Sequence, residues 1–309
     1  MPNNLPKVIF IVGPTASGKT ELGTFLAKEF DGEIVNADSR QVYKEMSIAT
    51  AKPNRDDLSS KDKDFIFNGV VHHLMDIVRP NQPFTLADYK ERANEAINAI
   101  ISKKKLPIVV GGTGLYIWTL VDNLDIPKVA PNRKLRKSFD NKTLVDLVKL
   151  LKNVDPQAAQ KVDLKNKRRV LRALEVAISS GESFITQATK SFPLYNCLQI
   201  GLSLPREELY DRVNARIDKQ MQQGLLEETK NLSAKYAWDL PSMSSIGYKQ
   251  IGSFLRGEVS LETALEIFKR DTRRYAKKQL SWFKRDKRII WVPKNNLRLV
   301  KKIIGKFLN

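Results

Sequence analysis

The sequence predicts an α/β protein with a mostly parallel sheet and a helical insertion domain, for two reasons. Short apolar runs alternate with helical patterns, at residues 8–12, 33–36, 107–110, 198–204 and 288–292. Most of these runs lack strict polar alternation, which is typical of parallel strands buried on both faces. Residues 121–193 instead hold helical patterns and no convincing strand, so we expect a helical segment inserted into an α/β core.

A glycine-rich loop follows the first apolar run and precedes a helical pattern over 21–30. It reads Gly13-Pro14-Thr15-Ala16-Ser17-Gly18-Lys19-Thr20, which fits G-x-x-x-x-G-K-[ST] in the strand, loop and helix context that this motif requires. In such a loop, backbone N–H groups and a helix N-terminus face an anion, Lys19 adds a positive charge and the Thr20 hydroxyl can hold Mg²⁺. The loop therefore predicts a P-loop NTPase-like core that binds a nucleotide or a diphosphate, with Mg²⁺ as cofactor.

A polar cluster, Asp38-Ser39-Arg40-Gln41, follows the second apolar run. A doubly wound sheet delivers its active-site residues at the carboxyl ends of its strands, so this cluster is expected beside the bound phosphate. Asp38 could serve there as a Mg²⁺ ligand, as a structural turn residue or as a general base. Its position favours a role in the site.

The third apolar run is introduced by a helix and followed by glycines. Thr85 has the character of an N-cap, with Asp88 three residues on, for a helix that runs towards Ser102. Gly111-Gly112-Thr113-Gly114 then follows the strand. Glycines at this position allow a ligand to approach the backbone closely, and the Thr113 hydroxyl would project into the same crevice, although a plain left-handed turn would also explain them.

The insertion is expected to be basic. Helical patterns cover 144–152 and 165–180, and Gly181 suits the end of the second. We expect residues 1–120 and 194–309 to form the α/β core, with its C-terminal helices, and 121–193 to form the inserted domain. Its basic residues include Lys134, Arg136, Lys137, Lys165, Lys167, Arg168, Arg169 and Arg172.

Helices also follow the fourth apolar run, over 206–223, 261–284 and 297–309, and Gly224 suits a helix end. Arg212 and Arg216 lie four residues apart and therefore share a helix face. Both could reach an anion in the crevice, or they could form a solvated basic face.

The composition indicates what kind of partner the protein binds and in which cellular compartment it works. The net charge of +19 makes a polyanionic partner expected, most commonly a nucleic acid, although a solubility bias would also produce it. A single cysteine, Cys197, excludes an internal disulfide and a multi-cysteine zinc site. The adjacent His72 and His73 suit a loop or packing role better than a metal site. No stretch is long and apolar enough to span a bilayer and no signal peptide is evident, so we expect a soluble cytoplasmic protein. Separately, we expect it to act as a monomer.

Together these motifs resemble one family, the bacterial-type tRNA dimethylallyltransferases, which are tRNA prenyltransferases. The matching segments occur in the family's order over most of the chain. Where the family commonly has Gln-Ala before Ile-Gly-Tyr, this chain has Ser244-Ser245. The matching segments are residues 13–20, 36–43 (NADSRQVY), 50–53 (TAKP), 72–74 (HHL), 110–116 (VGGTGLY), 168–175 (RRVLRALE) and 246–248 (IGY).

The resemblance implies transfer of a dimethylallyl group from dimethylallyl diphosphate to the N6 amine of the adenosine 3′ of the anticodon in tRNA. It implies that residues 13–20 hold the diphosphate, that Lys19 and Asp38 are catalytic, with Asp38 as general base, and that Thr113 lines the reaction channel. It places the anticodon stem-loop against the insertion. The residues that it assigns to tRNA contact are Asp38, Ser39, Arg40, Gln41, Lys134, Arg168, Arg169, Val170, Leu171, Arg172, Ile246, Gly247 and Tyr248.

Three other functions stay open at this stage. A P-loop kinase would transfer a phosphoryl group to a small molecule, but it does not account for the basic insertion or the polar cluster after the second strand. A nucleic-acid-dependent NTPase would show RNA affinity that depends on nucleotide. A prenyltransferase acting on free adenine nucleotides would keep the chemistry but has no use for the large positive charge.

Overall fold

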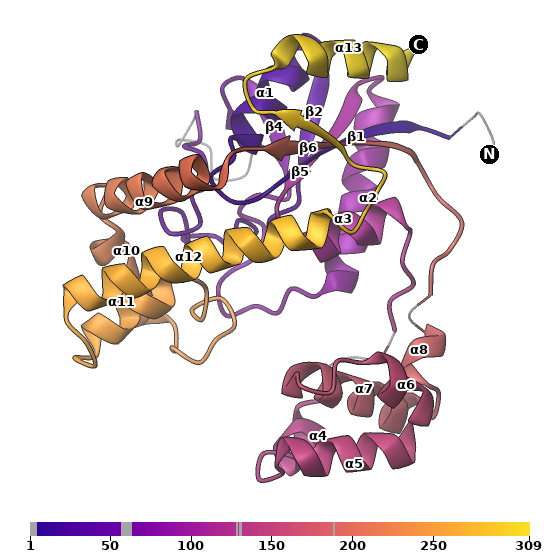
Figure 1. Ribbon diagram of the computed structural model, residues 1–309, viewed down its shortest axis with the longest axis vertical. Helices are drawn as coiled ribbons and strands as arrows, with labels where there is room; N and C mark the ends of the chain where they lie inside the picture. The colour runs from indigo at the N-terminus through magenta and orange to yellow at the C-terminus, as the bar shows by residue number, and fades with distance from the viewer. Residues whose placement is uncertain (1–4, 57–63, 128, 130–131, 188) are drawn as a thin grey trace. The chain divides into compact units, whose positions relative to one another are not determined.

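The computed structural model describes residues 5–56, 64–127, 129, 132–187 and 189–309 (Figure 1). In this part of the chain one sheet has the strand order β3-β4-β2-β5-β1-β6-β7, and all neighbouring strands are parallel except the β3–β4 pair. The fold is therefore α/β with a mostly parallel sheet, as predicted. The strands are β1 (Lys7–Val12), β2 (Gly32–Asn36), β3 (Phe65–Phe67), β4 (Val70–His73), β5 (Leu106–Gly111), β6 (Asn196–Ser203) and β7 (Ile290–Pro293).

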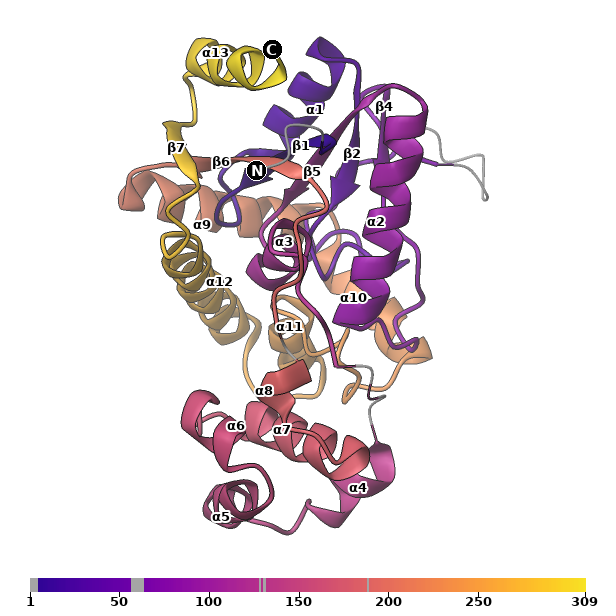
Figure 2. The ribbon, with the colours of Figure 1, turned by 90° about the vertical axis from the view of Figure 1, so that its right-hand side faces the viewer.

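Alternate residues of β1 show why its apolar run has no polar positions. Val8, Phe10 and Val12 face one side of the sheet, and Ile9 and Ile11 face the other; all five are completely buried. The first face is covered by α2 (Leu86–Ser102) and α3 (Gly114–Val121), and the second by α1 (Lys19–Glu29) and α13 (Leu297–Leu308), as Figure 2 shows. A central parallel strand covered on both faces must be apolar throughout.

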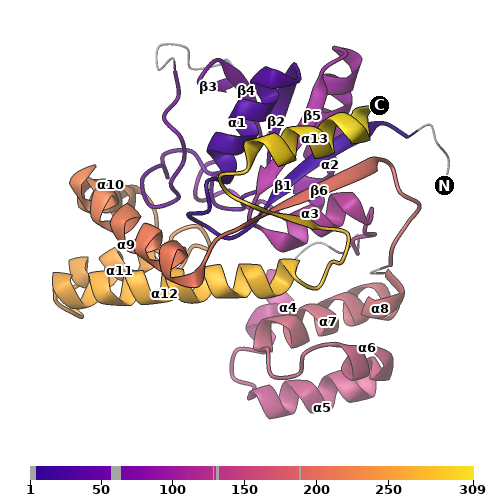
Figure 3. The same cartoon turned by 45° about the horizontal axis from the view of Figure 1, so that its top comes forward.

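The helices α9 (Arg206–Gln222), α10 (Leu225–Lys235), α11 (Tyr248–Leu255) and α12 (Leu261–Phe283) form a third group (Figure 3). Their core takes in side chains of the segment after β2, including Val42, Tyr43 and Met46. This packing ties the end of β2 to helices that lie far away in the sequence.

The chain divides into two compact units, Met1–Val121 with Leu194–Asn309 (unit 1) and Asp122–Pro193 (unit 2). The first boundary lies one residue from the expected one, and the second, between residues 193 and 194, coincides with it. Unit 2 has a core of its own, in which Leu147 and Leu151 pack with Val170 and Leu174. Its helices are α4 (Arg133–Ser138), α5 (Leu144–Val154), α6 (Pro156–Lys161), α7 (Lys167–Ser180) and α8 (Phe184–Gln187).

Every strand and helix expected from the sequence is confirmed, with ends that agree within two residues. The cap at Thr85 is confirmed too: its hydroxyl accepts from the Asp88 N–H, and the Asp88 carboxylate accepts from the Thr85 N–H at 2.7 Å. The β3–β4 hairpin was not expected. Its turn, Asn68-Gly69, has positive φ at both residues and is the dipeptide that a type I′ turn favours, so a signal for it was present.

Candidate active site

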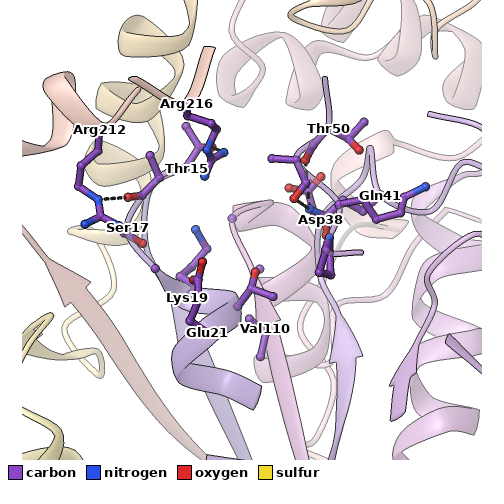
Figure 4. Close-up of a pocket in the computed structure, with 18 of the residues that line it drawn as sticks. Thr15, Ser17, Lys19, Glu21, Asp38, Gln41, Thr50, Val110, Arg212 and Arg216 are labelled. Atoms are coloured by element: carbon purple, nitrogen blue, oxygen red, sulfur yellow. Dashed lines mark hydrogen bonds between the residues drawn. The ribbon is translucent and has the colours of Figure 1, made fainter. Parts of the chain in front are cut away.

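A cavity of about 560 Å³ lies at the carboxyl ends of β1, β2 and β5 in unit 1. Figure 4 shows its two sides. Lys19, Arg212 and Arg216 lie on one, which we call the cationic side, and Asp38, Gln41 and Thr50 lie on the other, which we call the carboxylate side. In the strand order β2-β5-β1-β6 the chain leaves β1 towards β2 on one side and leaves β5 towards β6 on the other. Folds of this kind bind ligands where the direction of the connections reverses in this way.

The P-loop has the backbone shape that its glycines predict. Gly13 and Gly18 both have positive φ, 148° and 91°, which residues with a side chain rarely adopt. Between them the Ser17 hydroxyl is completely buried and has no hydrogen-bond partner in the described residues. Lys19 turns back and donates to the Pro14 carbonyl at 2.5 Å. The loop thus holds an unpaired hydroxyl and an ammonium at the start of α1, as an anion site does.

Two arginines of α9 close the cationic side. Arg212 Nε donates to the Ala16 carbonyl at 2.9 Å, and Arg216 donates to the Thr15 hydroxyl at 2.9 Å. Both arginines therefore contact the P-loop from one helix face, and their contact with a bound anion stays a prediction. Burial, and then the charge of Arg216, lower the pKa of Lys19 to about 8. Burial also lowers the pKa of Arg216. Cations confined in this way favour a polyanionic ligand.

Asp38 is fixed by the turn that follows β2. Its backbone N–H donates to Asn36 Oδ1 at 3.0 Å, and its Oδ1 accepts from the Arg40 N–H at 2.8 Å. Oδ2 accepts no hydrogen bond in the described residues, so one carboxylate oxygen is available at the cavity wall. A carboxylate held by one oxygen and open at the other has the form of a general base.

Thr113 contacts the Asp38 turn and is not among the residues that line the cavity. Its hydroxyl accepts from the Ser39 N–H at 3.0 Å and donates to the Ser39 hydroxyl at 3.3 Å. In this structure Thr113 holds the turn that carries Asp38. Its place in a reaction channel stays a prediction.

The neighbouring glycines leave room for the protein's own packing, which corrects the interpretation as a left-handed turn; Gly111 and Gly112 also line the cavity, so close approach of a ligand there stays a prediction. None of Gly111, Gly112 and Gly114 has positive φ. A Cβ would lie 2.2 Å from the Ala37 carbonyl oxygen at Gly111, 2.3 Å from Gln279 Nε2 at Gly112 and 2.1 Å from Trp282 at Gly114. The missing side chains therefore make room for β2 and α12, and no left-handed turn is involved.

Gln279 of α12 is a site residue that the sequence did not indicate. Its Oε1 accepts from the Thr15 N–H of the P-loop at 2.8 Å, and its Nε2 donates to the Gly112 carbonyl at 2.8 Å. One turn earlier on α12, Tyr275 forms side-chain hydrogen bonds with Thr113 and Gln279. One buried amide therefore connects the loops after β1 and β5. No local pattern predicts such a contact, because each partner lies more than 160 residues from Gln279 in the sequence.

Lys52 is a second residue that sequence reasoning did not assign to the site. It lines the carboxylate side, donates to the Tyr43 carbonyl at 2.7 Å and forms an ion pair with Asp76. Burial lowers its pKa, and the charge of Asp76 opposes that effect. Its signal was the Thr50-Ala51-Lys52-Pro53 segment of the family resemblance.

The residues expected to contact tRNA in unit 1 differ in accessibility. Arg40 donates to the Pro241 carbonyl at 2.9 Å, and Gln41 donates to the Thr50 and Ala51 carbonyls at 3.1 and 3.2 Å. The Tyr248 side chain is 0% exposed. The tyrosine ring can therefore affect an RNA contact only through what it packs against.

The residues expected to contact tRNA in unit 2 divide in the same way. Lys134, Arg168 and Arg169 are exposed, and Arg169 lies 3.7 Å from the Asp163 carboxylate. Val170 is completely buried and Leu171 is half-buried in the unit's core. Val170 and Leu171 pack α7 against the core of unit 2, so among the residues expected to contact tRNA only the exposed cations are accessible to a partner.

Arg172 is occupied within unit 2. It donates to Glu175 at 2.6 Å and to the Val129 carbonyl at 2.8 Å. Glu175, whose side chain is 1% exposed, also accepts from Arg136 and from the Asn132 N–H. Arg172 is thus engaged by a buried carboxylate, which needs cationic partners, and its contact with RNA stays a prediction.

The adjacent histidines lie on β4 and serve packing. His72 is buried, with its ring edge-on to Phe65 and Phe67, and His73 Nε2 lies 2.8 Å from the Glu33 carboxylate. Among the described residues no group of histidine, cysteine and acidic side chains could hold a metal ion. No helix found there is long and apolar enough to cross a membrane.

Comparisons with known proteins agree with this geometry. A family model described as IPP transferase matches residues 41–286. The chain belongs to the IPP transferase family. The predicted resemblance to tRNA dimethylallyltransferases is therefore confirmed. A tRNA dimethylallyltransferase of Acetivibrio thermocellus is 41% identical and covers 97% of this chain and 96% of its own length. One of Geotalea uraniireducens is 45% identical, over 93% of this chain and 92% of its own.

Solved structures give the same family likeness. The tRNA isopentenylpyrophosphate transferase of Bacillus halodurans has a TM-score of 0.71 and 35% identity, and covers 98% of this chain and 95% of its own. A eukaryotic dimethylallyltransferase acting on tRNA has a TM-score of 0.77 and 28% identity, over 95% of this chain and 75% of its own. The IPP transferase likeness thus extends over both units and is not confined to residues 41–286.

Proposed function

We propose that this protein transfers a dimethylallyl group from dimethylallyl diphosphate to the N6 amine of an adenosine in tRNA, the one 3′ of the anticodon. One observation carries the proposal: a single cavity has cations for a diphosphate on one side and a carboxylate, Asp38, on the other. The relatives are named tRNA dimethylallyltransferases, which supports this class of donor and acceptor.

The cationic side suits the leaving group. As the bond between C1 of the donor and its diphosphate oxygen breaks, negative charge gathers on the diphosphate. Lys19, Arg212, Arg216 and the P-loop N–H groups are already in place around that position, so they stabilise this charge without rearrangement.

The carboxylate side suits the acceptor. The adenine amine is a weak nucleophile because its lone pair is conjugated with the ring. As N6 forms the new bond to C1, it must lose a proton, and the open Oδ2 of Asp38 can accept it. A positioned base contributes roughly 10²–10⁴-fold in rate. The adenine must leave the anticodon-loop stack to reach the cavity, which costs less from a loop than from a duplex.

The donor set at the start of α1 fits Mg²⁺. Thr20 lines the cavity, and its hydroxyl has no hydrogen-bond partner in the described residues, so it could hold the ion together with diphosphate oxygens. Oxygen ligands of this kind are the ones that Mg²⁺ prefers. When bound, the ion would neutralise part of the charge on the departing diphosphate.

Unit 2 supplies the RNA-binding part of the proposal. Lys134, Arg168 and Arg169 present exposed charge that can contact phosphates of the anticodon stem-loop, and the net charge of +19 favours such a partner. Phosphate contacts would give affinity and orientation, whereas the cavity would select the base.

The test is incubation with unmodified tRNA and labelled dimethylallyl diphosphate in Mg²⁺ buffer, followed by nucleoside analysis. We expect a prenylated adenosine at the position 3′ of the anticodon and release of diphosphate. A parallel incubation with ATP separates the kinase and NTPase alternatives. Phosphoryl transfer or RNA-stimulated ATP hydrolysis without prenylated nucleoside would refute the proposal.

A further inference from the structure

The loop after β2, residues 46–52, forms much of the carboxylate side of the cavity. It contributes Thr50, Ala51 and Lys52 to the cavity wall. Ala51 has φ 51°, a conformation that a residue with a side chain adopts only when its surroundings impose it. The 46–52 loop therefore needs an external support to keep its shape.

Glu228 of α10 provides that support by binding the backbone of the loop. Its carboxylate accepts from the N–H groups of Ser47 at 3.1 Å, Ile48 at 3.0 Å and Ala49 at 3.4 Å. Three consecutive N–H groups directed at one carboxylate form an anion-binding concavity that is filled by a side chain of the same protein. Hydrogen bonds to an ionised acceptor are about twice as strong as neutral ones.

Helix α9 holds the same stretch through its carbonyl groups. Gln220 donates to the Ile48 and Ala49 carbonyls, at 2.5 and 3.3 Å. The loop is thus bound by its N–H groups to α10 and by its C=O groups to α9. Gln41 then continues the contact into the cavity by donating to the Thr50 and Ala51 carbonyls.

The Ile246-Gly247-Tyr248 segment takes part in this support. The Tyr248 hydroxyl donates to Glu228 Oε1 at 2.6 Å. Gly247 has φ 99°, and a Cβ there would lie 2.8 Å from the Ala49 Cβ, so a side chain at 247 would displace the loop. Gly247 and Tyr248 thus both contribute to the position of the 46–52 loop. The Tyr248 ring is fully buried, so it has no exposed surface that could contact RNA.

We infer that Glu228 is a positioning residue for the transfer reaction. It binds three consecutive N–H groups of the 46–52 loop and accepts a hydrogen bond from Tyr248. In this way it holds the loop in the shape that places Lys52 beside Asp38 in the cavity wall. The inference rests on the proposed function for its chemical consequence, and on the contacts of Glu228 alone for its structural part. The family segment Ile246-Gly247-Tyr248 is then explained as a support for the cavity wall.

The test compares two variants that make the same change on adjacent residues of α10. Glu228→Gln keeps the size of the side chain and removes its charge. Glu227→Gln is the matched control, because Glu227 is exposed and has no partner in the described residues. In single-turnover assays with both substrates saturating, we expect Glu228→Gln to lower the rate by roughly 10–100-fold, the scale of loss that follows a small misplacement of reacting groups. We expect Glu227→Gln to keep the parent rate.

Two further measurements separate positioning from RNA contact. The dissociation constant of dimethylallyl diphosphate should stay within about twofold, since the P-loop is untouched. Hydrogen exchange of the backbone amides at 47–49 should quicken in Glu228→Gln and not in Glu227→Gln, because these amides lose their acceptor. If Glu228→Gln unfolds the protein, Tyr248→Phe removes one hydroxyl from the same network and should give the same changes, smaller in size.

The inference is overturned if Glu228→Gln and Tyr248→Phe both match Glu227→Gln in rate and in exchange. It is also overturned if the loss consists only of weaker tRNA binding with a smaller salt slope, since that identifies a phosphate contact. If the parent forms no prenylated adenosine, the proposed function fails, whereas the exchange measurement still decides whether Glu228 holds the loop.

Discussion

At the scale of single residues, the site works through groups that are held at one end and open at the other. Asp38 is bound through Oδ1 and open at Oδ2, and Ser17 presents a buried hydroxyl with no partner in the described residues. Such groups are costly to leave unpaired in a folded protein. Their cost is offset when substrate supplies the missing partner, so these residues are the ones whose substitution should affect the reaction more than the fold.

Asp38→Asn should lower the single-turnover rate by roughly 10²–10⁴-fold, because an amide of the same size cannot accept the N6 proton. Binding of tRNA should stay within a few-fold of the parent, as measured by filter binding. Asp31→Asn is the control: Asp31 lies at the other end of β2, is largely exposed, and has a positive φ that asparagine tolerates. A near-normal rate for Asp38→Asn would remove Asp38 from the role of base.

The affinity for dimethylallyl diphosphate should depend on pH through Lys19. Its pKa is about 8 in the free protein, lowered first by burial and then by Arg216, so the ammonium loses its proton as the pH rises through that value. A bound polyanion favours the charged form, and the affinity should therefore be full well below pH 8 and weaken above it. Calorimetric titration from pH 7 to 9.5 measures this, and Lys19→Arg should remove the dependence while Lys19→Ala weakens binding throughout.

At the scale of elements, the correct predictions rest on local signals, although the equally local Asn68-Gly69 signal of the β3–β4 hairpin was missed. The strands of the sheet, the P-loop and the capped helix at Thr85 follow from residues within a few positions of one another. What could not be predicted depends on distant partners: Gln279 joins Thr15 to Gly112, and the buried Glu175 accepts from Arg136 and from the Asn132 N–H, 39 and 43 residues away. The glycines after β5 show the same limit, since the sequence reveals that space is needed but not whether a ligand or α12 fills it.

The P-loop and the first turn of α1 should act as one metal-dependent element. Thr20→Ala removes the hydroxyl that we assign to Mg²⁺, so it should raise the Mg²⁺ concentration required for half-maximal transfer by about tenfold or more. The measurement is a titration of the transfer rate with Mg²⁺ after exhaustive chelation. Thr24→Ser, one turn further along and bonded to the Thr20 carbonyl, should leave the requirement unchanged. Full activity of the parent in excess chelator would contradict the metal assignment.

Helix α7 combines exposed and occupied arginines, and their substitutions should differ in kind. Arg168→Ala with Arg169→Ala should weaken tRNA binding and lower the salt slope by about one unit for each phosphate that the variant no longer neutralises. Arg172→Ala should chiefly destabilise unit 2, by about 1–3 kcal/mol, because it leaves the buried Glu175 with fewer partners. Salt-dependent filter binding and thermal unfolding distinguish the two effects. If the 168/169 variant keeps the parent's affinity and slope, these arginines only solvate the helix.

At the scale of the whole molecule, the two units divide the proposed work. Unit 1 holds every residue that lines the cavity, and unit 2 has its own apolar core and a surface rich in lysine and arginine. The two chain segments that lead into unit 2 and out of it run side by side. Asp125 N–H donates to the Thr189 carbonyl at 2.8 Å, and Ser191 N–H to the Asn123 carbonyl at 3.3 Å. Neighbouring entry and exit points are the arrangement in which an inserted unit can be removed without breaking its host.

Replacing residues 122–193 by a short glycine and serine linker should therefore leave unit 1 folded and able to bind its donor. The dissociation constant of dimethylallyl diphosphate should stay within about threefold of the parent, because the P-loop, Arg212 and Arg216 belong wholly to unit 1. Binding of tRNA should fall by at least tenfold at low salt, and transfer to tRNA should be lost, since the exposed cations of unit 2 are gone.

Calorimetric titration with the donor and filter binding with tRNA measure the two outcomes on one preparation. A linker variant that binds the donor normally and keeps the parent's tRNA affinity would show that the core alone grips the RNA, and unit 2 would then need another role. A variant that folds but loses the donor as well would contradict the separation of the two tasks. The matched control restores 122–193 with Arg168 and Arg169 as alanine. It should recover part of the lost affinity, because Lys134 and the remaining lysines are still present.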